Sequence, residues 1–394
     1  MKREDQIRQL KELIGQLEEG TAVDAGGIIK VPAETYTSED RFQQEWDVFF
    51  KNHAQIIGAS ADLPEPGSFF TLNDFGIPIL ATRDDEGNFL AFANICSHRA
   101  SIVEKEKKGS KEKFSCPFHG WTYDNKGNLI GYPKSSQFGE IDKSCYGLTP
   151  LPSIEKHGLL WVHPDKDGEI NVEELLGKEL DETFSTWHFN QLIHAKDDEY
   201  YTDMNWKLAI DTFGETYHFS VLHKNSLFES FHGNVGLQNS FDRNGMLTLC
   251  KREIDNMKNE PEENWHIVRG ALPVYYLFPN IILLVFDFGM ILLREYPVDN
   301  SPHKSVSKIS FYVWPGVLET VSIEEIRSEI GTGFADVIKE EDYVAAADSH
   351  KSLISGAIDF LTFGRNEPML HHYHNTYREA LGLIPLEKLN SVKT

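Results

Sequence analysis

The chain has few cysteines and few positive charges. Four cysteines in 394 residues are too few for the disulfide framework of a small secreted protein, so a reducing, cytoplasmic location is expected. Lys and Arg number 38 against 61 Asp and Glu, which gives a net charge of −23. This charge argues against nucleic acid and anionic membranes as partners, because both attract positive surfaces.

The sequence also has no uninterrupted apolar run long enough to span a membrane. The first twenty residues, MKREDQIRQLKELIGQLEEG, are charged throughout and are not expected to be a signal peptide. The spacing of their Ile and Leu residues predicts an amphipathic helix. The most apolar stretch, 274–298, is broken at Pro279-Asn280 and again at Asp287. It is predicted to form strand, turn and strand in an antiparallel sheet that is buried on both faces.

The length of the chain predicts two domains. Residues 41–165 alternate short β-like runs with turn signals and are predicted to be all-β. Residues 166–394 mix both element types, so this part is predicted to be α+β, with helices laid on an antiparallel sheet. We expect helices at 205–222, 322–330 and 335–355, and strands at 246–255, 265–298 and 305–314.

Two cysteines and two histidines form mixed pairs, Cys96-x-His98 and Cys116-x-x-His119. Three interpretations compete. A structural zinc site usually pairs like with like, and a redox dithiol leaves the histidines unexplained. A Rieske [2Fe–2S] centre uses two thiolates on one iron and two imidazoles on the other. The mixed pairs favour this third interpretation, because each loop then supplies one ligand to each iron.

A second group of metal-ligand residues follows in NWKLAIDTFGETYHFSVLHKNS, which carries Glu215, His218 and His223. On a helix, Glu215 and His218 share a face. Two histidines and one distant carboxylate form the facial triad of non-heme Fe(II) oxygenases. A histidine pair on an amphipathic helix is, by itself, more often structural.

The segments CSHRA and CPFHGWTYD resemble the Rieske domain of the ring-hydroxylating (Rieske non-heme iron) oxygenases, large-subunit type. The spacing Glu215-x-x-His218-x₄-His223 and the preceding NWK are also similar to that family. The resemblance implies an all-β Rieske [2Fe–2S] domain at 41–165 and a catalytic domain at 166–394. In the catalytic domain, a helix-grip-like antiparallel sheet with helices would hold a mononuclear iron. Residues 1–40 would be a helical segment that packs on this catalytic domain.

The resemblance also assigns roles to particular residues. It implies cluster ligands Cys96, His98, Cys116 and His119, iron ligands His218, His223 and Asp342, and a bridging carboxylate Glu215. The alternative for Asp342 is a solvated first helical turn together with Glu340 and Glu341. Two positions depart from the family pattern: His350 stands where Gln is common, and Asp211-Thr212 stands where many members have Glu-Asn. The cluster MLHHYH, with His371, His372 and His374, is expected to be structural.

The implied function is that of a terminal oxygenase component. Electrons from a ferredoxin or an NAD(P)H-dependent reductase, together with O₂, would hydroxylate an aromatic or similar apolar small molecule, as in aromatic hydrocarbon catabolism. The alternative is an N- or O-demethylase or monooxygenase, for example of a quaternary ammonium compound, with the same metals. The family assembles as trimers, with or without a small β subunit. A plain Rieske electron carrier or a zinc-binding scaffold would use only part of these residues.

Two further hypotheses concern partners. Five lysines outnumber three glutamates in the loop 103–114 between the two cluster pairs, and this loop could steer an acidic ferredoxin, although a solvated loop is the simpler interpretation. Candidate substrate-pocket residues are apolar and could equally form core. They are Phe213, Phe219, Leu222, Phe286 and Phe288.

Overall fold

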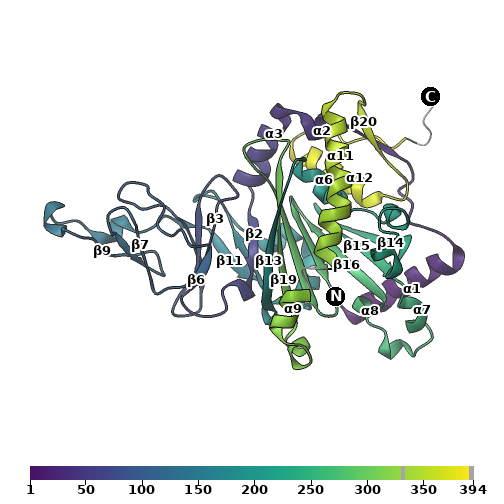
Figure 1. Cartoon of the computed structure of the whole chain (residues 1–394), viewed down its shortest axis with the longest axis horizontal. Coiled ribbons are helices and arrows are strands. Elements are labelled where there is room, and N and C mark those ends of the chain that lie inside the picture. Colours follow the sequence, from purple (N-terminus) through teal and green to yellow (C-terminus); the bar gives the residue numbers. More distant parts are fainter. Residues whose placement is uncertain (330–332, 390–394) are drawn as a thin grey trace. The chain divides into compact units, whose positions relative to one another are not determined.

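The computed structural model describes residues 1–329 and 333–389 and divides the chain into two compact units. The larger unit contains Met1–Glu45, Glu173–Trp187 and the chain from Leu192 onward (Figure 1). The smaller unit contains Trp46–Val172 and His188–Gln191. The N-terminal segment therefore belongs to the same unit as the C-terminal half. The change of unit near Val172 lies a few residues after the boundary expected at 165.

The smaller unit is built from three small antiparallel sheets with strand orders β10-β5-β4-β3-β6, β11-β12-β2 and β7-β8-β9. The hairpin expected at WTYDNKGNLIGYP is formed by β8 and β9. Asp124 Oδ1 accepts the backbone N–H groups of Lys126 and Asn128 at its tip. The strands are β2 Gln55–Ala59, β3 Ser68–Leu72, β4 Ile79–Arg83, β5 Phe89–Ala93, β6 Lys108–Ser110, β7 Lys113–Ser115, β8 Thr122–Asp124, β9 Leu129–Gly131, β10 Pro150–Leu151, β11 Ser153–Lys156 and β12 Leu159–Val162.

The larger unit is organised around a seven-stranded antiparallel sheet with the order β13-β19-β18-β17-β16-β15-β14. The apolar stretch 274–298 lies in its middle and forms most of three strands, with turns at the two predicted breaks. Every residue of β16 and β17 is buried, as expected for a sheet covered on both faces. The strands are β13 Ile193–Thr202, β14 Phe231–Phe241, β15 Asn244–Lys251, β16 Ala271–Leu277, β17 Ile281–Val285, β18 Gly289–Pro297 and β19 Ser305–Val313.

Helices pack on this sheet. The N-terminal helix α1 (Arg3–Glu19) contacts β14 and buries Leu10 and Leu13, in agreement with its predicted amphipathic pattern. Helix α6 (Trp206–Asp211) packs on β18 and β19, and α12 (Pro368–Ala380) on β14 and β15. Figure 1 shows α11 (Tyr343–Ile354) beside α6 and α12, in front of the sheet. A short helix α9 (Ile323–Glu329) lies against β13. No helix in the described residues is long and apolar enough to cross a membrane.

The prediction of one helix over 205–222 is wrong. Asn205 caps α6 by accepting the backbone N–H of Lys207 at 3.0 Å, but the helix ends at Asp211. Gly214 packs so closely that a Cβ on it would lie 2.2 Å from Cδ2 of Leu370. The chain turns there and forms only a 3₁₀ turn at Tyr217–Ser220. Glu215 and His218 therefore meet in this turn and not on the face of an α-helix.

Strand β13, the early end of β15 and the division of the helix expected at 335–355 were not predicted. Strand β13 carries IHAKDDEYYT, and its charged residues obscure the apolar alternation because its side chains are mostly exposed or half-buried. The strand expected at 246–255 ends at Lys251 and is followed by α7 (Ile254–Met257). The helix expected at 335–355 is divided into α10 (Phe334–Val337), a π-helical turn at Ile338–Asp342 and α11.

A buried carboxyl group sits at the start of α11. Glu295 on β18 is 0% exposed, and its carboxyl oxygens contact the Ser307 hydroxyl at 2.5 Å and the Tyr343 hydroxyl at 3.0 Å. Burial raises the pKa of Glu295 to about 8, although the hydrogen bonds from Ser307 and Tyr343 lower it. The group is therefore a neutral hydrogen-bonding partner for α11 at mildly acidic pH.

The raised pKa of Glu295 predicts a pH-dependent stability. Between about pH 4.5 and pH 8 the folded state holds a proton that the unfolded chain releases, so the free energy of unfolding falls as the pH rises. We expect Glu295→Gln to flatten this fall, by about 1.4 kcal/mol per pH unit at most. Melting temperatures measured across this range check it, with the exposed Glu319→Gln as control. An equally steep fall in both variants would contradict the assignment.

Candidate metal centres

The two cysteine–histidine pairs lie on two loops with the same backbone hydrogen bonding. In the first loop, Cys96 N–H donates to Ser101 O at 2.8 Å and Ala100 N–H donates to Cys96 O at 2.9 Å. In the second, Cys116 N–H donates to Trp121 O at 2.8 Å and Gly120 N–H donates to Cys116 O at 2.9 Å. The repeated turn presents one cysteine and one histidine from each side.

Both turns need a left-handed residue at the same place. The φ angle is +57° at Ala100 and +71° at Gly120. Glycine adopts this conformation without a steric penalty, whereas the Cβ of alanine approaches the neighbouring carbonyl oxygen. Ala100 is therefore a position of local backbone strain.

The side chains of these loops form a compact donor set. Cys96 and Cys116 are free thiols at 3% and 2% exposure. The His98 ring lies 4.6 Å from the His119 ring and stacks on Trp121 at 4.9 Å. Nδ1 of His98 is buried and has no hydrogen-bond partner. This nitrogen is free to bind a metal, and its neighbours are two thiols and a second imidazole, so the group fits a cluster ligand set.

Tyr123 supports the cysteine side of the centre. Its hydroxyl lies 3.2 Å from Cys96 Sγ, and it also contacts the backbone N–H of Ser97 at 3.1 Å. Burial, together with the contact to Cys96, raises the pKa of Tyr123 to about 12. The hydroxyl therefore keeps its proton and can donate to a thiolate at Cys96.

The second centre lies in the larger unit, where His218, His223 and Asp342 converge. The two Nε2 atoms are 3.1 Å apart, and Asp342 Oδ1 lies 3.4 Å from His218 Nε2 and 3.3 Å from His223 Nε2. One ligand atom from each residue lies within 4.8 Å of the others. Asp342 is 5% exposed, which excludes the alternative of a solvated helix turn. Two imidazoles and one carboxylate that share a point fit a facial-triad iron site.

The other ring nitrogen of each histidine is held by a carboxylate. Glu215 Oε1 is in short contact with His218 Nδ1, and Glu341 Oε2 lies 2.8 Å from His223 Nδ1. The hydroxyl of Ser226 donates to the same Glu341 oxygen at 2.9 Å. These partners fix the tautomer in which both Nε2 lone pairs face the common point. No sequence pattern indicated a role for Glu341 beyond its place beside Asp342.

The charges of the three triad residues stabilise one another: the pKa values of both histidines are raised and that of Asp342 is lowered. Burial lowers the pKa of His218, but hydrogen bonds to Asp342 and Glu215 outweigh it and raise the pKa to about 9. Burial also lowers the pKa of His223, but the interaction with Asp342 outweighs burial and raises the pKa of this histidine as well. The two histidines hold the pKa of Asp342 below its usual value in spite of burial. The site therefore favours positive charge between the carboxylates.

The two departures from the family pattern lie outside this triad. His350 is 1% exposed, and its Nε2 lies 3.1 Å from His303 Nδ1. The Thr212 hydroxyl donates to Ala209 O at 2.8 Å. Asp211 contacts the Tyr36 hydroxyl at 2.6 Å and His374 Nε2 at 2.9 Å. His350, Thr212 and Asp211 therefore form hydrogen bonds with neighbouring residues around the site.

The MLHHYH histidines do not form a metal site of their own. His371 Nε2 lies 3.3 Å from Phe363 O, His372 Nε2 lies 2.8 Å from Asn244 O, and His374 contacts Asp211. Each ring thus has a different partner, which agrees with the structural role expected for this helix.

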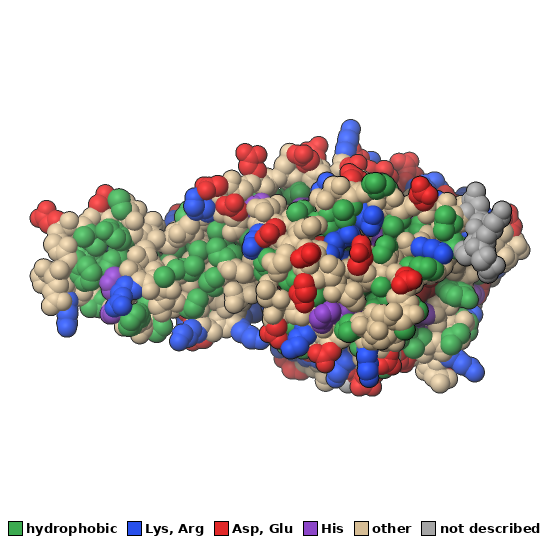
Figure 2. All heavy atoms as spheres, turned by 90° about the horizontal axis from the view of Figure 1, so that it is seen from above, with side chains coloured by type: hydrophobic (Ala, Val, Ile, Leu, Met, Phe, Trp, Pro, Cys, Tyr) green, Lys and Arg blue, Asp and Glu red, His purple; other side chains and the backbone are tan. Residues whose placement is uncertain are grey.

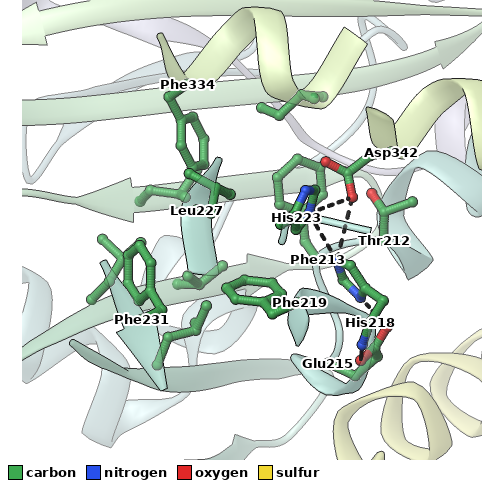
Figure 3. Close-up of a pocket in the computed structure, with 15 residues that line it drawn as sticks. Thr212, Phe213, Glu215, His218, Phe219, His223, Leu227, Phe231, Phe334 and Asp342 are labelled. Atoms are coloured by element: carbon green, nitrogen blue, oxygen red, sulfur yellow. Dashed lines mark hydrogen bonds and ion pairs between the residues drawn. The ribbon is translucent and has the colours of Figure 1, made fainter. Parts of the chain in front are cut away.

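An apolar pocket adjoins the triad; we call it the inner chamber. Its volume is about 30 Å³, and it lies between the sheet and α10. Figure 3 shows Phe231, Leu227 and Phe334 on the side away from His218, His223 and Asp342. Phe219 lies beside the triad, with its ring centre 5.0 Å from that of His218 and 5.1 Å from that of His223. Apart from the triad and Glu215, its lining carries no charged side chain. Phe213 and Phe219, two of the residues expected to line a pocket, do so, whereas Leu222, Phe286 and Phe288 line other surfaces.

Two family models match the chain. The model of the Rieske [2Fe-2S] domain matches residues 53–153, and the model of the ring hydroxylating alpha subunit (catalytic domain) matches residues 189–383. The chain belongs to the Rieske non-heme iron oxygenases. The suspected family and the fold class are thus confirmed, with a Rieske domain followed by a catalytic domain. This Rieske oxygenase is a terminal oxygenase component, and its two domains imply a [2Fe–2S] cluster and a mononuclear iron.

Curated relatives of this Rieske oxygenase act on different substrates. It is 25% identical over 362 residues to choline monooxygenase from Spinacia oleracea, with 89% of this chain and 78% of the relative covered. It is 26% identical over 255 residues to the large subunit of anthranilate 1,2-dioxygenase from Acinetobacter baylyi, with 64% and 54% covered.

Solved structures show the same fold. The quaternary ammonium Rieske monooxygenase CntA in complex with L-carnitine matches with a TM-score of 0.74 at 18% identity, covering 90% of this chain and 96% of that chain. Naphthalene 1,2-dioxygenase from Rhodococcus sp. bound to indole matches with a TM-score of 0.72 at 18% identity, covering 95% and 98%.

The strain at Ala100 yields a matched pair of predictions. Ala100→Gly removes the Cβ from a left-handed position and is expected to stabilise the Rieske domain by about 0.5–1 kcal/mol, after the larger backbone entropy of glycine is subtracted. Gly120→Ala is expected to destabilise, because its Cβ would also lie 3.1 Å from Pro133 Cγ. Thermal loss of the cluster's visible absorbance measures both variants. Equal or reversed shifts would refute the strain.

Glu341 yields a second prediction for the iron centre. Because Glu341 orients His223, Glu341→Ala, which removes the acceptor for Nδ1 of His223, is expected to weaken iron binding by about 10- to 100-fold, as is usual for such supporting residues. Iron retained after dialysis against a graded chelator measures the change. The adjacent Glu340 is exposed, so Glu340→Ala is the matched control and is expected to retain iron like the unaltered chain. Equal loss in both would count against the contact.

Proposed function

We propose that this Rieske oxygenase inserts oxygen into an apolar small molecule at an iron held by His218, His223 and Asp342. The observation that carries the proposal is the convergence of these three ligand atoms at one end of an apolar chamber. The iron, when bound, supplies the site at which O₂ is activated with electrons from the cluster. The chain orients the two imidazoles, shields the reacting position from water and holds the substrate against it.

We assign the cluster to Cys96, His98, Cys116 and His119. Two observations support this assignment: the thiols of Cys96 and Cys116 are buried, and Nδ1 of His98 has no hydrogen-bond partner. Burial, His119 and Arg99 lower the pKa of His98, which favours the neutral imidazole that a metal needs. A zinc site would not need the repeated mixed loops.

Substrate class follows from the inner chamber. Its aromatic lining of Phe213, Phe219, Phe231 and Phe334 supports an aromatic or similarly apolar substrate, which fits a role in aromatic catabolism. Anthranilate and naphthalene dioxygenases among the similar proteins agree with this class.

A second candidate, oxidative demethylation, is favoured by one specific observation. The inner chamber holds about 30 Å³, whereas a cavity that binds benzene needs about 150 Å³. A methyl-sized group fits this space without movement of the walls, and a whole ring does not. Phenylalanine rings also attract quaternary ammonium groups. Similarity to choline monooxygenase and to CntA, a quaternary ammonium monooxygenase, supports the same alternative.

Electron transfer is proposed to run between subunits through Glu215. Glu215 and His218 also line a further cavity of about 310 Å³ next to the triad. Asp211 and Glu367 belong to the lining of the same cavity. Exposed apolar residues flank this side, with Tyr217 at 66% and Val221 at 81% exposure. In the Rieske unit, Phe118 beside the exposed His119 is 54% exposed. Figure 2 shows hydrophobic side chains next to histidine on the surface of this unit. Exposed apolar side chains on both units support association between copies of this chain. We propose that the assembly is a trimer, with or without a small β subunit.

A ferredoxin or an NAD(P)H-dependent reductase is the proposed electron donor. The lysine-rich loop gives this proposal limited support, since Lys108 pairs with Asp62 at 2.8 Å and Lys111 with Glu104 at 2.7 Å. These two lysines therefore contribute to the fold of the loop. The cytoplasmic location expected from the four cysteines, all of them free, stays a prediction.

Isotope labelling tests the function and separates its two candidates. The purified chain with a surrogate reductase is incubated under ¹⁸O₂ with panels of aromatic compounds and of N- or O-methyl compounds. Labelled ring hydroxyl groups would establish the first candidate. Formaldehyde formed together with the demethylated compound, one of each per O₂ consumed, would establish the second. A chain that binds about three irons per polypeptide yet forms neither product from any compound would refute the proposal.

Glu215→Gln tests the bridging role. The amide keeps the size of the side chain but loses the negative charge between His218 and a neighbouring histidine, so both metals are expected to remain while turnover falls by a factor of about 100 or more. Iron content, the cluster spectrum and single-turnover reoxidation of the cluster are the measurements. Glu367→Gln, in the same cavity, is the matched comparison. Full activity in Glu215→Gln would remove the residue from the electron path.

A further inference from the structure

A larger cavity lies next to the inner chamber; we call it the outer chamber. Its volume is about 520 Å³, against about 30 Å³ for the inner chamber. The two share Leu227, Phe231 and Phe334 as lining. Figure 3 shows these three side chains on the side of the inner chamber opposite the triad. A molecule that reaches the triad from the outer chamber must therefore pass them.

The apolar part of the outer chamber is aromatic. Phe286 and Phe288 stack with ring centres 4.7 Å apart, and Phe334 meets Phe286 edge-on at 5.6 Å. Their rings offer a flat apolar wall to the body of a substrate. The volume suffices for a body that the inner chamber cannot hold.

Two cations in the lining of the outer chamber have unused hydrogen-bonding capacity, and Nζ of Lys251 lies 5.8 Å from the centre of the Phe286 ring. Lys251 Nζ donates to Val268 O at 2.6 Å, and Arg252 Nε donates to Phe228 O at 3.0 Å. No other hydrogen-bond acceptor among the described residues contacts either cation, so two ammonium N–H groups and the terminal guanidinium N–H groups stay available. Both side chains are half-buried.

The acidic residues of the same chamber do not neutralise these cations by direct contact. The Glu253 carboxylate accepts hydrogen bonds from Arg269 and Asn256, both at 2.9 Å. Glu229 and Asp287 are exposed to solvent. Burial lowers the pKa of Lys251, and the nearby Asp287 only partly opposes this. An anion from outside the chain would complete the coordination of both cations.

We propose that the substrate carries a carboxylate, which Lys251 and Arg252 bind in the outer chamber while the apolar end of the same molecule enters the inner chamber. The inference rests on the proposed function. It selects, within the apolar class, molecules with an anionic group at one end. The small inner chamber then admits only a terminal group of about methyl size, and the body lies along Phe286 and Phe288.

Equilibrium binding of two probes of equal shape tests the proposal. Purified enzyme is titrated calorimetrically with 4-methylbenzoate and with 4-methylbenzamide, which lacks the charge. We expect the acid to bind at least about tenfold more tightly, because charge-assisted hydrogen bonds exceed neutral ones. Lys251→Gln keeps a donor for Val268 O but removes the charge, so the preference is expected to fall to about threefold or less.

Controls separate charge from structural damage. Lys258→Met removes a lysine outside the chamber and is expected to keep the full preference for the acid. Lys251→Arg is expected to restore most of it. Melting temperature and iron content show whether each variant is folded.

The outcomes are decisive in both directions. Equal affinity for acid and amide in the unaltered chain, an unchanged preference in Lys251→Gln, or no binding of either probe would each overturn the proposal. The titration needs neither a reductase nor turnover. A failure of the isotope experiment with a retained preference for the acid would therefore count against the oxygenase proposal alone.

Discussion

The structure depends on holding at one point the three side chains that we propose to bind iron. His218 lies in a short 3₁₀ turn, His223 follows this turn, and Asp342 ends the π-helical turn ahead of α11. Such an arrangement keeps its geometry only if the far side of each ligand is anchored. Glu215 and Glu341 provide this anchor for the two imidazoles.

The surrounding fold stabilises these anchors. The N-terminal segment, α6 and α12 meet in the buried contacts among Tyr36, Asp211 and His374, one residue from the wall of the inner chamber. At the start of α11, Glu295 and Tyr343 tie the helix to the sheet. A change in any of these elements would shift a ligand, so the N-terminal segment is part of the catalytic domain physically as well as topologically.

The inner and outer chambers have different linings. The inner chamber offers the triad and apolar walls, and the outer chamber offers aromatic surface together with two cations. In a chain with a net charge of −23, half-buried cations without carboxylate partners are unusual and concentrate the affinity for anions locally. Orientation of a substrate then follows from charge at one end and from size at the other.

The sequence by itself determined the donor groups and the family. Cys96-x-His98 and Cys116-x-x-His119 indicate a mixed donor set, because each tight loop offers one thiolate and one imidazole and so can supply one ligand to each iron of a Rieske cluster. The continuous apolar run of 274–298 likewise required a sheet covered on both faces.

Only the tertiary structure decided what lies around those groups. The close packing of Gly214 on Leu370 ended the helix that periodicity predicted, and β13 was hidden by its charged, exposed side chains. Glu341 and Lys251 become partners of a ligand and of a chamber only through contacts between residues far apart in the chain. Such long-range contacts leave no periodic signal in the sequence, and packing overrides local propensity where the two disagree.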